Sequence, residues 1–219
     1  GSITYTRDIG EGTLTNIAGA KGMKSRAVSD IDATPNHIFH APSYLKTEQY
    51  SNELRYNIRL SDMVDLTTGL YYFQQDIDYI EVRSLFGGTT IVGGGGTQEQ
   101  TTSGAFIAAD WNLTEAVTLT TGVRYTEEEK KGQVASLSPG GNCTVEKKKC
   151  DNFNLEETKD WSNVSPKVAL QWFLNESTQV YASYSKGYRA GNFNGGVYYE
   201  VRDFEEAYAE PEFIDACEL

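Results

Sequence analysis

The residues best suited to binding a metal ion are two aspartates and two histidines in one polar segment. Asp30, Asp32, His37 and His40 offer carboxylate and imidazole groups, which are common metal ligands. Their spacing does not match that of a known cation-binding loop. We therefore expect a solvated loop at this segment and no metal site.

Catalytic chemistry has little support in the sequence. These two histidines are the only ones in the chain, which leaves few residues for a Ser-His-Asp or Cys-His arrangement. The run Gly93–Gly96 lacks the lysine and hydroxyl residue that complete a phosphate-binding loop. We interpret the run as a flexible loop tip, and we expect no catalytic residues, no cofactor and no enzymatic activity.

Two of the three cysteines lie close together in a polar segment that begins with glycines. The segment GGNCTVEKKKCDN contains Cys143 and Cys150 and is expected to be a loop, in which a local disulfide is compatible with an oxidising compartment. No histidine is near enough in sequence to complete a zinc site. Cys217 stands alone and is expected to be an unpaired strand residue.

The composition favours β-structure and argues against nucleic acid as a partner. The net charge is −12, so the chain offers no basic face for phosphates. Aromatic residues make up 12% of the chain, with 14 Tyr. No apolar run is long enough for a membrane-spanning helix. The charged runs 127–131 and 147–149 are interpreted as exposed strand ends and loop charges, whose lysines can meet lipopolysaccharide.

Three hairpins are predicted from apolar and polar residues that alternate with a period of two. The first joins residues 50–60 to 64–72 across the Ser61–Asp62 turn, the second joins 104–113 to 117–126, and the third joins 163–174 to 179–185. Pro166 lies inside the third hairpin, and because proline cannot donate to a strand ladder it needs a strand end or a bulge.

Long polar segments connect these hairpins. We expect a first strand at Ser2–Asp8 and the beginning of an eighth at Glu212–Leu219. Four long loops are expected at residues 9–45, 83–97, 132–157 and 191–211. Short turns that alternate with long loops are typical of outer-membrane β-barrels, with the turns in the periplasm and the loops outside the cell.

One face of each predicted strand carries charged residues, which suits a wet or plugged lumen better than the dry core of a soluble β-sandwich. These inward residues are Glu53, Arg55, Arg59, Asp65, Arg124 and Lys167. Aromatic residues lie near the strand ends, where the girdles of a membrane barrel belong. They are Trp111 and Trp172 near the turns, and Tyr72, Tyr125, Tyr184 and Tyr188 toward the loops.

Residues 110–131, DWNLTEAVTLTTGVRYTEEEKK, and residues 161–194, which include VSPKVAL and GYRAGNFN, resemble the barrel domain of TonB-dependent outer-membrane receptors. The resemblance implies an all-β fold, in which this chain supplies about eight antiparallel strands of a plugged barrel of roughly 22 strands. Residues 1–219 are expected to be a partial barrel domain without the plug. Tyr188, Arg189, Asn192 and Asn194 are expected at a ligand-contacting rim.

The same resemblance implies import of a scarce, bulky nutrient: a ferric siderophore, cobalamin or a glycan. The expected location is the outer membrane of a Gram-negative bacterium. The expected partners are lipid and lipopolysaccharide, a plug domain, the TonB complex and the nutrient itself. Two alternatives remain: a passive channel or adhesin barrel, and a soluble β-rich module that binds carbohydrate through its tyrosines.

Overall fold

The computed structural model describes residues 1–137, 153–193 and 208–219, and almost all of them lie in antiparallel strands. The described helical structure is the short 3₁₀ turn η1 (Phe86–Gly88). In the described part of the chain, no helix is both long enough and apolar enough to span a membrane.

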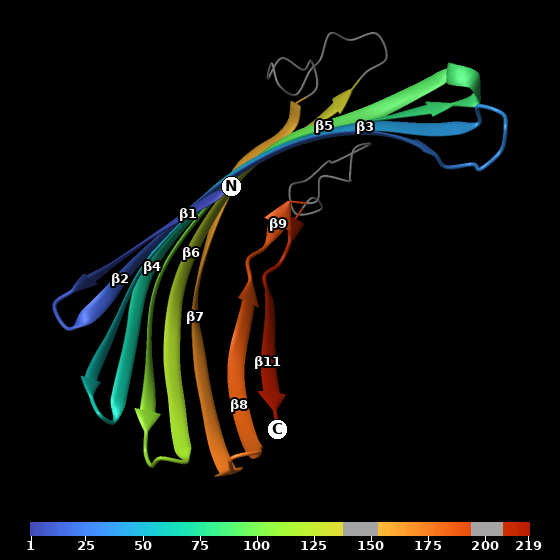
Figure 1. Ribbon diagram of the computed structural model, residues 1–219. Helices are drawn as coiled ribbons and strands as arrows, with labels where there is room; N and C mark the ends of the chain where they lie inside the picture. Colours follow the sequence, from blue (N-terminus) through green and yellow to red (C-terminus); the bar gives the residue numbers. More distant parts are fainter. Residues whose placement is uncertain (138–152, 194–207) are drawn as a thin grey trace.

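Nine strands form one open, strongly twisted sheet in the order β1-β2-β3-β4-β5-β6-β7-β8-β11 (Figure 1). Their bounds are β1 Ser2–Ile9, β2 Gly12–Asp30, β3 Phe39–Ser61, β4 Val64–Leu85, β5 Thr90–Asn112, β6 Val117–Leu137, β7 Phe153–Asn175, β8 Thr178–Arg189 and β11 Glu212–Glu218. Two further short strands, β9 (Asn192–Phe193) and β10 (Tyr208–Ala209), pair with each other. The three predicted hairpins are thus confirmed as β3–β4, β5–β6 and β7–β8.

The expected long loop at residues 9–45 is wrong, because most of it forms β2. Gly10 has a φ of 62°, which permits a tight turn from β1 into β2. β2 then pairs along its length with β3, and only residues 31–38 remain as a loop. The strand was missed because its outer half carries small and charged side chains in place of alternating large apolar ones.

The other long loops are also shorter than predicted where the structure describes them. Gly93–Gly96 lies inside β5, paired with β4 and β6, and is not a loop tip. Glycine suits position 93 because a Cβ there would lie 2.9 Å from the carbonyl oxygen of Glu81 in β4. Likewise, β6 extends to Leu137 and β7 begins at Phe153, so the loop between them is shorter than residues 132–157.

The central strands are longer than a bilayer requires. β3 to β7 contain 21 to 23 residues each, whereas a tilted transmembrane strand needs about 9–11. At roughly 3.3 Å per residue, such strands reach about 70 Å or more. The short turns lie together at one end of the sheet, so the excess length projects at the end of the longer connections (Figure 1).

The register separates an apolar face from a polar one. One row across β3 to β7 on the apolar face reads Tyr56, Thr68, Ile107, Val123 and Pro166. The adjacent row on the other face reads Arg55, Gly69, Phe106, Arg124 and Ser165. These rows confirm the alternation on which the hairpins were predicted.

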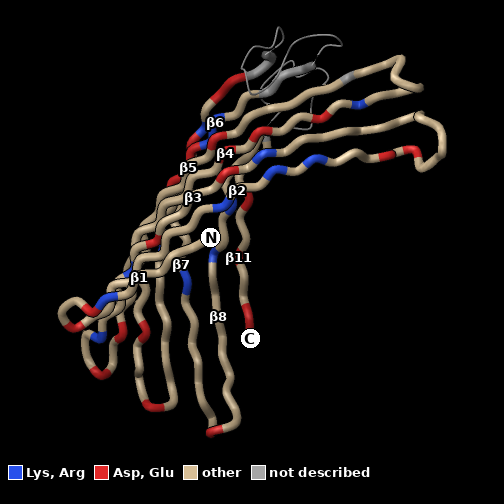
Figure 2. Tube along the Cα trace, turned by 45° about the horizontal axis from the view of Figure 1, so that its top comes forward, with Lys and Arg blue, Asp and Glu red and all other residues tan. Residues whose placement is uncertain are grey.

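The apolar face is exposed instead of being packed into a core. Val123 is 42% exposed and Trp172 is 50% exposed, and the buried hydrophobic residues of the described chain are limited to Ala41, Ala109, Ala190 and Phe193. On β6 the apolar face runs from Val117 to Tyr125, a length that fits one bilayer crossing. Charged residues lie at the turns and along the upper half of the sheet (Figure 2).

Candidate ligand-binding site

The candidate site begins where β8 leaves β7. The β7–β8 ladder ends at the pair Lys167–Ser185, directly beside Pro166, which has no N–H to donate. β8 then continues beside β11 up to Arg189. The proline therefore lies where one ladder ends, as the sequence required.

After β8 the chain crosses the polar face of β6. Ala190 is 6% exposed and Phe193 is 8% exposed. The Nζ atom of Lys130 donates a hydrogen bond to the carbonyl oxygen of Gly191 at 2.8 Å. We name residues 189–193 the strap, because this segment lies against the polar face of the sheet.

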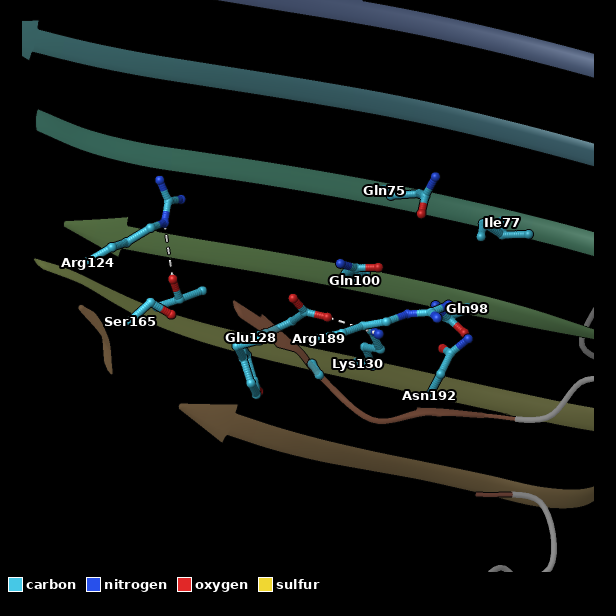
Figure 3. A pocket seen from close by; sticks show the side chains of 13 residues that line it. Gln75, Ile77, Gln98, Gln100, Arg124, Glu128, Lys130, Ser165, Arg189 and Asn192 are labelled. Atoms are coloured by element: carbon cyan, nitrogen blue, oxygen red, sulfur yellow. Dashed lines mark hydrogen bonds and ion pairs between the residues drawn. The ribbon is translucent and has the colours of Figure 1, made fainter. Parts of the chain in front are cut away.

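A cavity of about 500 Å³ lies between the strap and the polar face (Figure 3). Its volume falls within the range of small-molecule binding sites. The lining residues come from β4 to β8 and from the strap: Gln75, Ile77, Gln98, Gln100, Arg124, Thr126, Glu128, Lys130, Ser165, Tyr188, Arg189, Ala190 and Asn192.

The three basic side chains of the cavity differ in how far their charge is already neutralised. Lys130 forms an ion pair with Glu128 at 2.9 Å, and Arg189 forms one with Glu212 at 3.4 Å. Arg124 donates from Nε to the hydroxyl of Thr126 at 3.2 Å and has no ion pair within the described residues. Its guanidinium also lies 4.9 Å from the ring centroid of Tyr71. Arg124 is therefore the positive charge that remains available to a ligand.

Side-chain amides supply the neutral hydrogen-bonding groups. Gln75 lies directly opposite Gln100 in the β4–β5 register, and Gln98 lies opposite Ile77. The Oδ1 atom of Asn192 is buried and accepts no hydrogen bond from the described residues. Amides both donate and accept, so with Arg124 they form a surface suited to an oxygen-rich ligand.

The predicted rim residues largely meet at this cavity. Tyr188, Arg189 and Asn192 line it, whereas Asn194 lies outside the described residues. Whether they contact a ligand stays a prediction. The glutamines and Lys130 were not predicted as site residues, although their alternation along β5 and β6 places them on the polar face.

The interpretation of residues 127–131 as exposed charges is wrong for Lys130, which is 6% exposed. Because side chains alternate between the two faces of β6, Glu128 and Lys130 lie beneath the strap. Lys131 lies on the opposite face and forms an ion pair with Glu156 at 3.3 Å. The run 147–149 and the cysteines Cys143 and Cys150 lie outside the described residues. Cys217 is a free, exposed thiol in β11, as predicted.

The aspartates and histidines near the β2–β3 loop come together in space. Metal-ligating atoms of Asp30, Asp32 and His40 lie within 4.8 Å of one another, and the ring of His37 stacks on that of His40 with centroids 4.0 Å apart. Asp32 already accepts hydrogen bonds, from the backbone N–H of Thr34 at 3.1 Å and from that of Phe39 at 2.6 Å. These bonds hold Asp32 within the loop of residues 31–38, whereas Asp30 and His40 pair directly in the β2–β3 ladder. The expected loop is therefore confirmed only for the residues between these two strands.

The Asp32 carboxylate makes the conformation of this loop dependent on pH. Hydrogen bonds, first from the Thr34 side chain and then from the Phe39 backbone, lower the pKa of Asp32 from 3.8 to about 2. Its stabilising effect is therefore complete above pH 3.8 and is lost as the pH falls through about 2. We expect the amide resonances of Thr34 and Phe39 to titrate with a midpoint near the lower value.

Asp32→Asn should abolish this titration, and Asp62→Asn in the β3–β4 turn should leave it unchanged. A midpoint near 4, the ordinary value for an unperturbed aspartate, would contradict the assignment.

Comparison with known proteins identifies the family. The model of the family described as "TonB dependent receptor-like, beta-barrel" matches residues 2–212. No curated protein matches the chain. The ferric yersiniabactin uptake receptor FyuA from Yersinia pestis has a similar structure, with a TM-score of 0.71 and 18% identity over 89% of this chain. The ferric-catecholate import receptor Fiu from E. coli K12, in its closed form, has a TM-score of 0.59 and 12% identity over 92% of this chain.

At these identities the two structures show a shared fold. The chain spans only 28% of the length of FyuA and 34% of the length of Fiu. The family match, which covers nearly the whole chain, accounts for the apolar outer band, the polar inner face and the alternation of short turns with longer connections. The chain therefore belongs to the TonB-dependent receptor β-barrel family, whose members lie in the outer membrane of Gram-negative bacteria.

Proposed function

We propose that this chain forms part of an outer-membrane receptor that imports a ferric siderophore with energy from the TonB complex. The observation that carries the proposal is the cavity on the polar face, which Arg124 and several amides line together. An iron chelate presents many oxygen acceptors, which suit these donors. FyuA and Fiu, whose folds are similar, are named as receptors for ferric compounds.

In this proposal the two faces of the sheet serve different partners. The apolar band meets outer-membrane lipid, and the charged strand segments above it meet lipopolysaccharide. The polar face surrounds a plug domain, and the plug transmits the action of the TonB complex. Cobalamin and glycans are the alternative nutrients, and they would use the same amide-lined face.

A passive channel is the main alternative function. The strap favours a receptor because it lies across the polar face, where an open diffusion channel would need free space. An adhesin would need neither the cavity nor energy from the inner membrane. Dependence of uptake on TonB therefore separates the three functions.

The proposal is tested by deleting the gene that encodes this chain in its bacterial host. We expect the deletion to abolish uptake of iron from one ferric siderophore, measured with radioactive iron, and to abolish growth when that siderophore is the only iron source. The intact gene should restore uptake only in cells with a functional TonB complex. Uptake that persists without TonB would indicate a channel, and unchanged uptake of every siderophore tested would refute the proposal.

The same assay tests the cavity. Arg124→Gln in the restored gene should weaken siderophore binding about tenfold or more, because hydrogen bonds to charged groups contribute about 1.5–3 kcal/mol. Arg59→Gln is the matched control, since Arg59 pairs with Asp65 near the β3–β4 turn and does not line the cavity. Equal effects of the two substitutions would exclude a specific role for the cavity.

A further inference from the structure

Lys130 is an unusual lysine because it is both buried and fully engaged. Its Nζ atom lies 2.9 Å from Glu128 Oε1 and 2.8 Å from the carbonyl oxygen of Gly191, and it also lies 5.8 Å from the ring centroid of Trp161. A buried ammonium group is costly unless it is paired and hydrogen-bonded. Both requirements are met here, and one of the partners is the backbone of the strap.

A second contact holds the strap two residues further along the same face of β6. A Cβ atom on Gly132 would lie 2.6 Å from Cδ2 and 2.7 Å from Cγ of Phe193. The ring of Phe193 therefore packs directly on the backbone of β6, at a place that only glycine leaves open. Lys130 and Gly132 thus hold neighbouring parts of the strap by different means, one polar and one steric.

We propose that residues 189–193 form a latched strap that closes one side of the cavity, with Lys130 as the residue that positions it. Arg189, Ala190 and Asn192 of the strap line the cavity, so its release would remove that wall. A cargo larger than the cavity must displace the strap to reach the polar face. The cargo follows from the proposed function, whereas the latch can be tested without cargo.

The charge balance explains why the latch is stable against an anionic cargo. Glu128 neutralises Lys130 within the buried pair, so an approaching anion gains little attraction from this lysine and is repelled by the carboxylate. Arg124, which has no such partner among the described residues, is the cation that the cargo meets. The two basic side chains therefore have separate roles, Arg124 in binding and Lys130 in positioning.

The test is hydrogen exchange of the strap amides, measured on the receptor that carries this chain, purified in detergent without cargo. Lys130→Met removes the charge and both polar contacts but keeps an unbranched side chain. We expect exchange in residues 190–193, which follow the β8–β11 ladder, to become at least about tenfold faster, while β6 amides from Thr118 to Thr126 keep their protection. Lys130→Arg, which retains a cation with several donors, should recover most of the protection.

Lys131→Met is the matched control, because Lys131 is the next residue, lies on the other face and pairs with Glu156. Gly132→Ala provides a second route: its methyl group should displace Phe193 and speed strap exchange with the Lys130 ion pair intact. Strap exchange that matches the Lys131→Met control in both Lys130→Met and Gly132→Ala would overturn the latch. Faster strap exchange in these variants, together with siderophore uptake that is unchanged when the gene is deleted, would support the latch and refute the proposed cargo.

Discussion

Val123→Arg is expected to destabilise the barrel by about 2–4 kcal/mol, the cost of a cation on the lipid face near the bilayer midplane. Val123 is 42% exposed and lies within the apolar stretch of β6 that runs from Val117 to Tyr125. The guanidinium of an arginine there would lose its hydration and would find no hydrogen-bonding partner in the lipid. The measurement is the free energy of unfolding of the intact receptor in lipid vesicles, together with its heat-dependent gel migration.

Thr67→Arg is the control for this substitution. Thr67 belongs to the adjacent row on the polar face, which already contains Lys167. A cation at this position remains hydrated, so its cost should stay below about 1 kcal/mol if the polar face lines the lumen. If both substitutions lowered the free energy of unfolding equally, the two faces would lie in the same environment. The assignment of the lipid face would then be wrong.

Gly69→Ala is expected to cost about 1–3 kcal/mol, although it adds a single methyl group. A Cβ on Gly69 would lie 2.5 Å from Cζ of Phe106 and 2.7 Å from the carbonyl oxygen of Leu54. Phe106 is the direct cross-strand partner of Gly69, and its ring covers the bare backbone. The ring can rotate away, but the carbonyl belongs to the β3–β4 ladder and cannot move without disturbing it.

Gly22→Ala separates crowding from the general effect of removing a glycine. Gly22 lies in β2, and a Cβ atom added to it would have no neighbouring atom within 4 Å, so alanine should be neutral or slightly stabilising there. Adding Phe106→Leu to Gly69→Ala should recover only part of the loss, because the contact with the Leu54 carbonyl persists. Full recovery would show that the ring alone causes the strain, and no loss in Gly69→Ala would disprove the close packing.

The strands with large alternating side chains were predictable, and those without them were not. Leu54, Tyr56 and Ile58 recur on one face of β3 with polar residues between them, and the predicted hairpin matches the structure. β2 has the same geometry, but Gly19 and Gly22 carry no side chain to mark either face. β2 is held in place by its backbone hydrogen bonds to β1 and β3. These partners cannot be recognised from the sequence of β2 alone.

The candidate site was only partly predictable for a similar reason. Alternation places Glu128 and Lys130 on the polar face, but it cannot show that a segment some sixty residues later covers them, as the Lys130–Gly191 hydrogen bond does. The contact between Gly132 and Phe193 likewise joins distant parts of the chain. Pro166 was the one local signal, because it indicated where a ladder must end.

The order of strands in the sheet also bears on how the chain folds. From β1 to β8, each strand pairs with the next one along the chain, and the turns at residues 10–11, 62–63 and 176–177 are short. Closing such short loops costs little entropy, and isolated hairpins form within about 1–10 μs. β11 pairs with β8 only after the chain from residue 190 to 211 has closed into a loop. Folding can therefore advance hairpin by hairpin, and the β8–β11 pairing closes a longer loop than these short turns do.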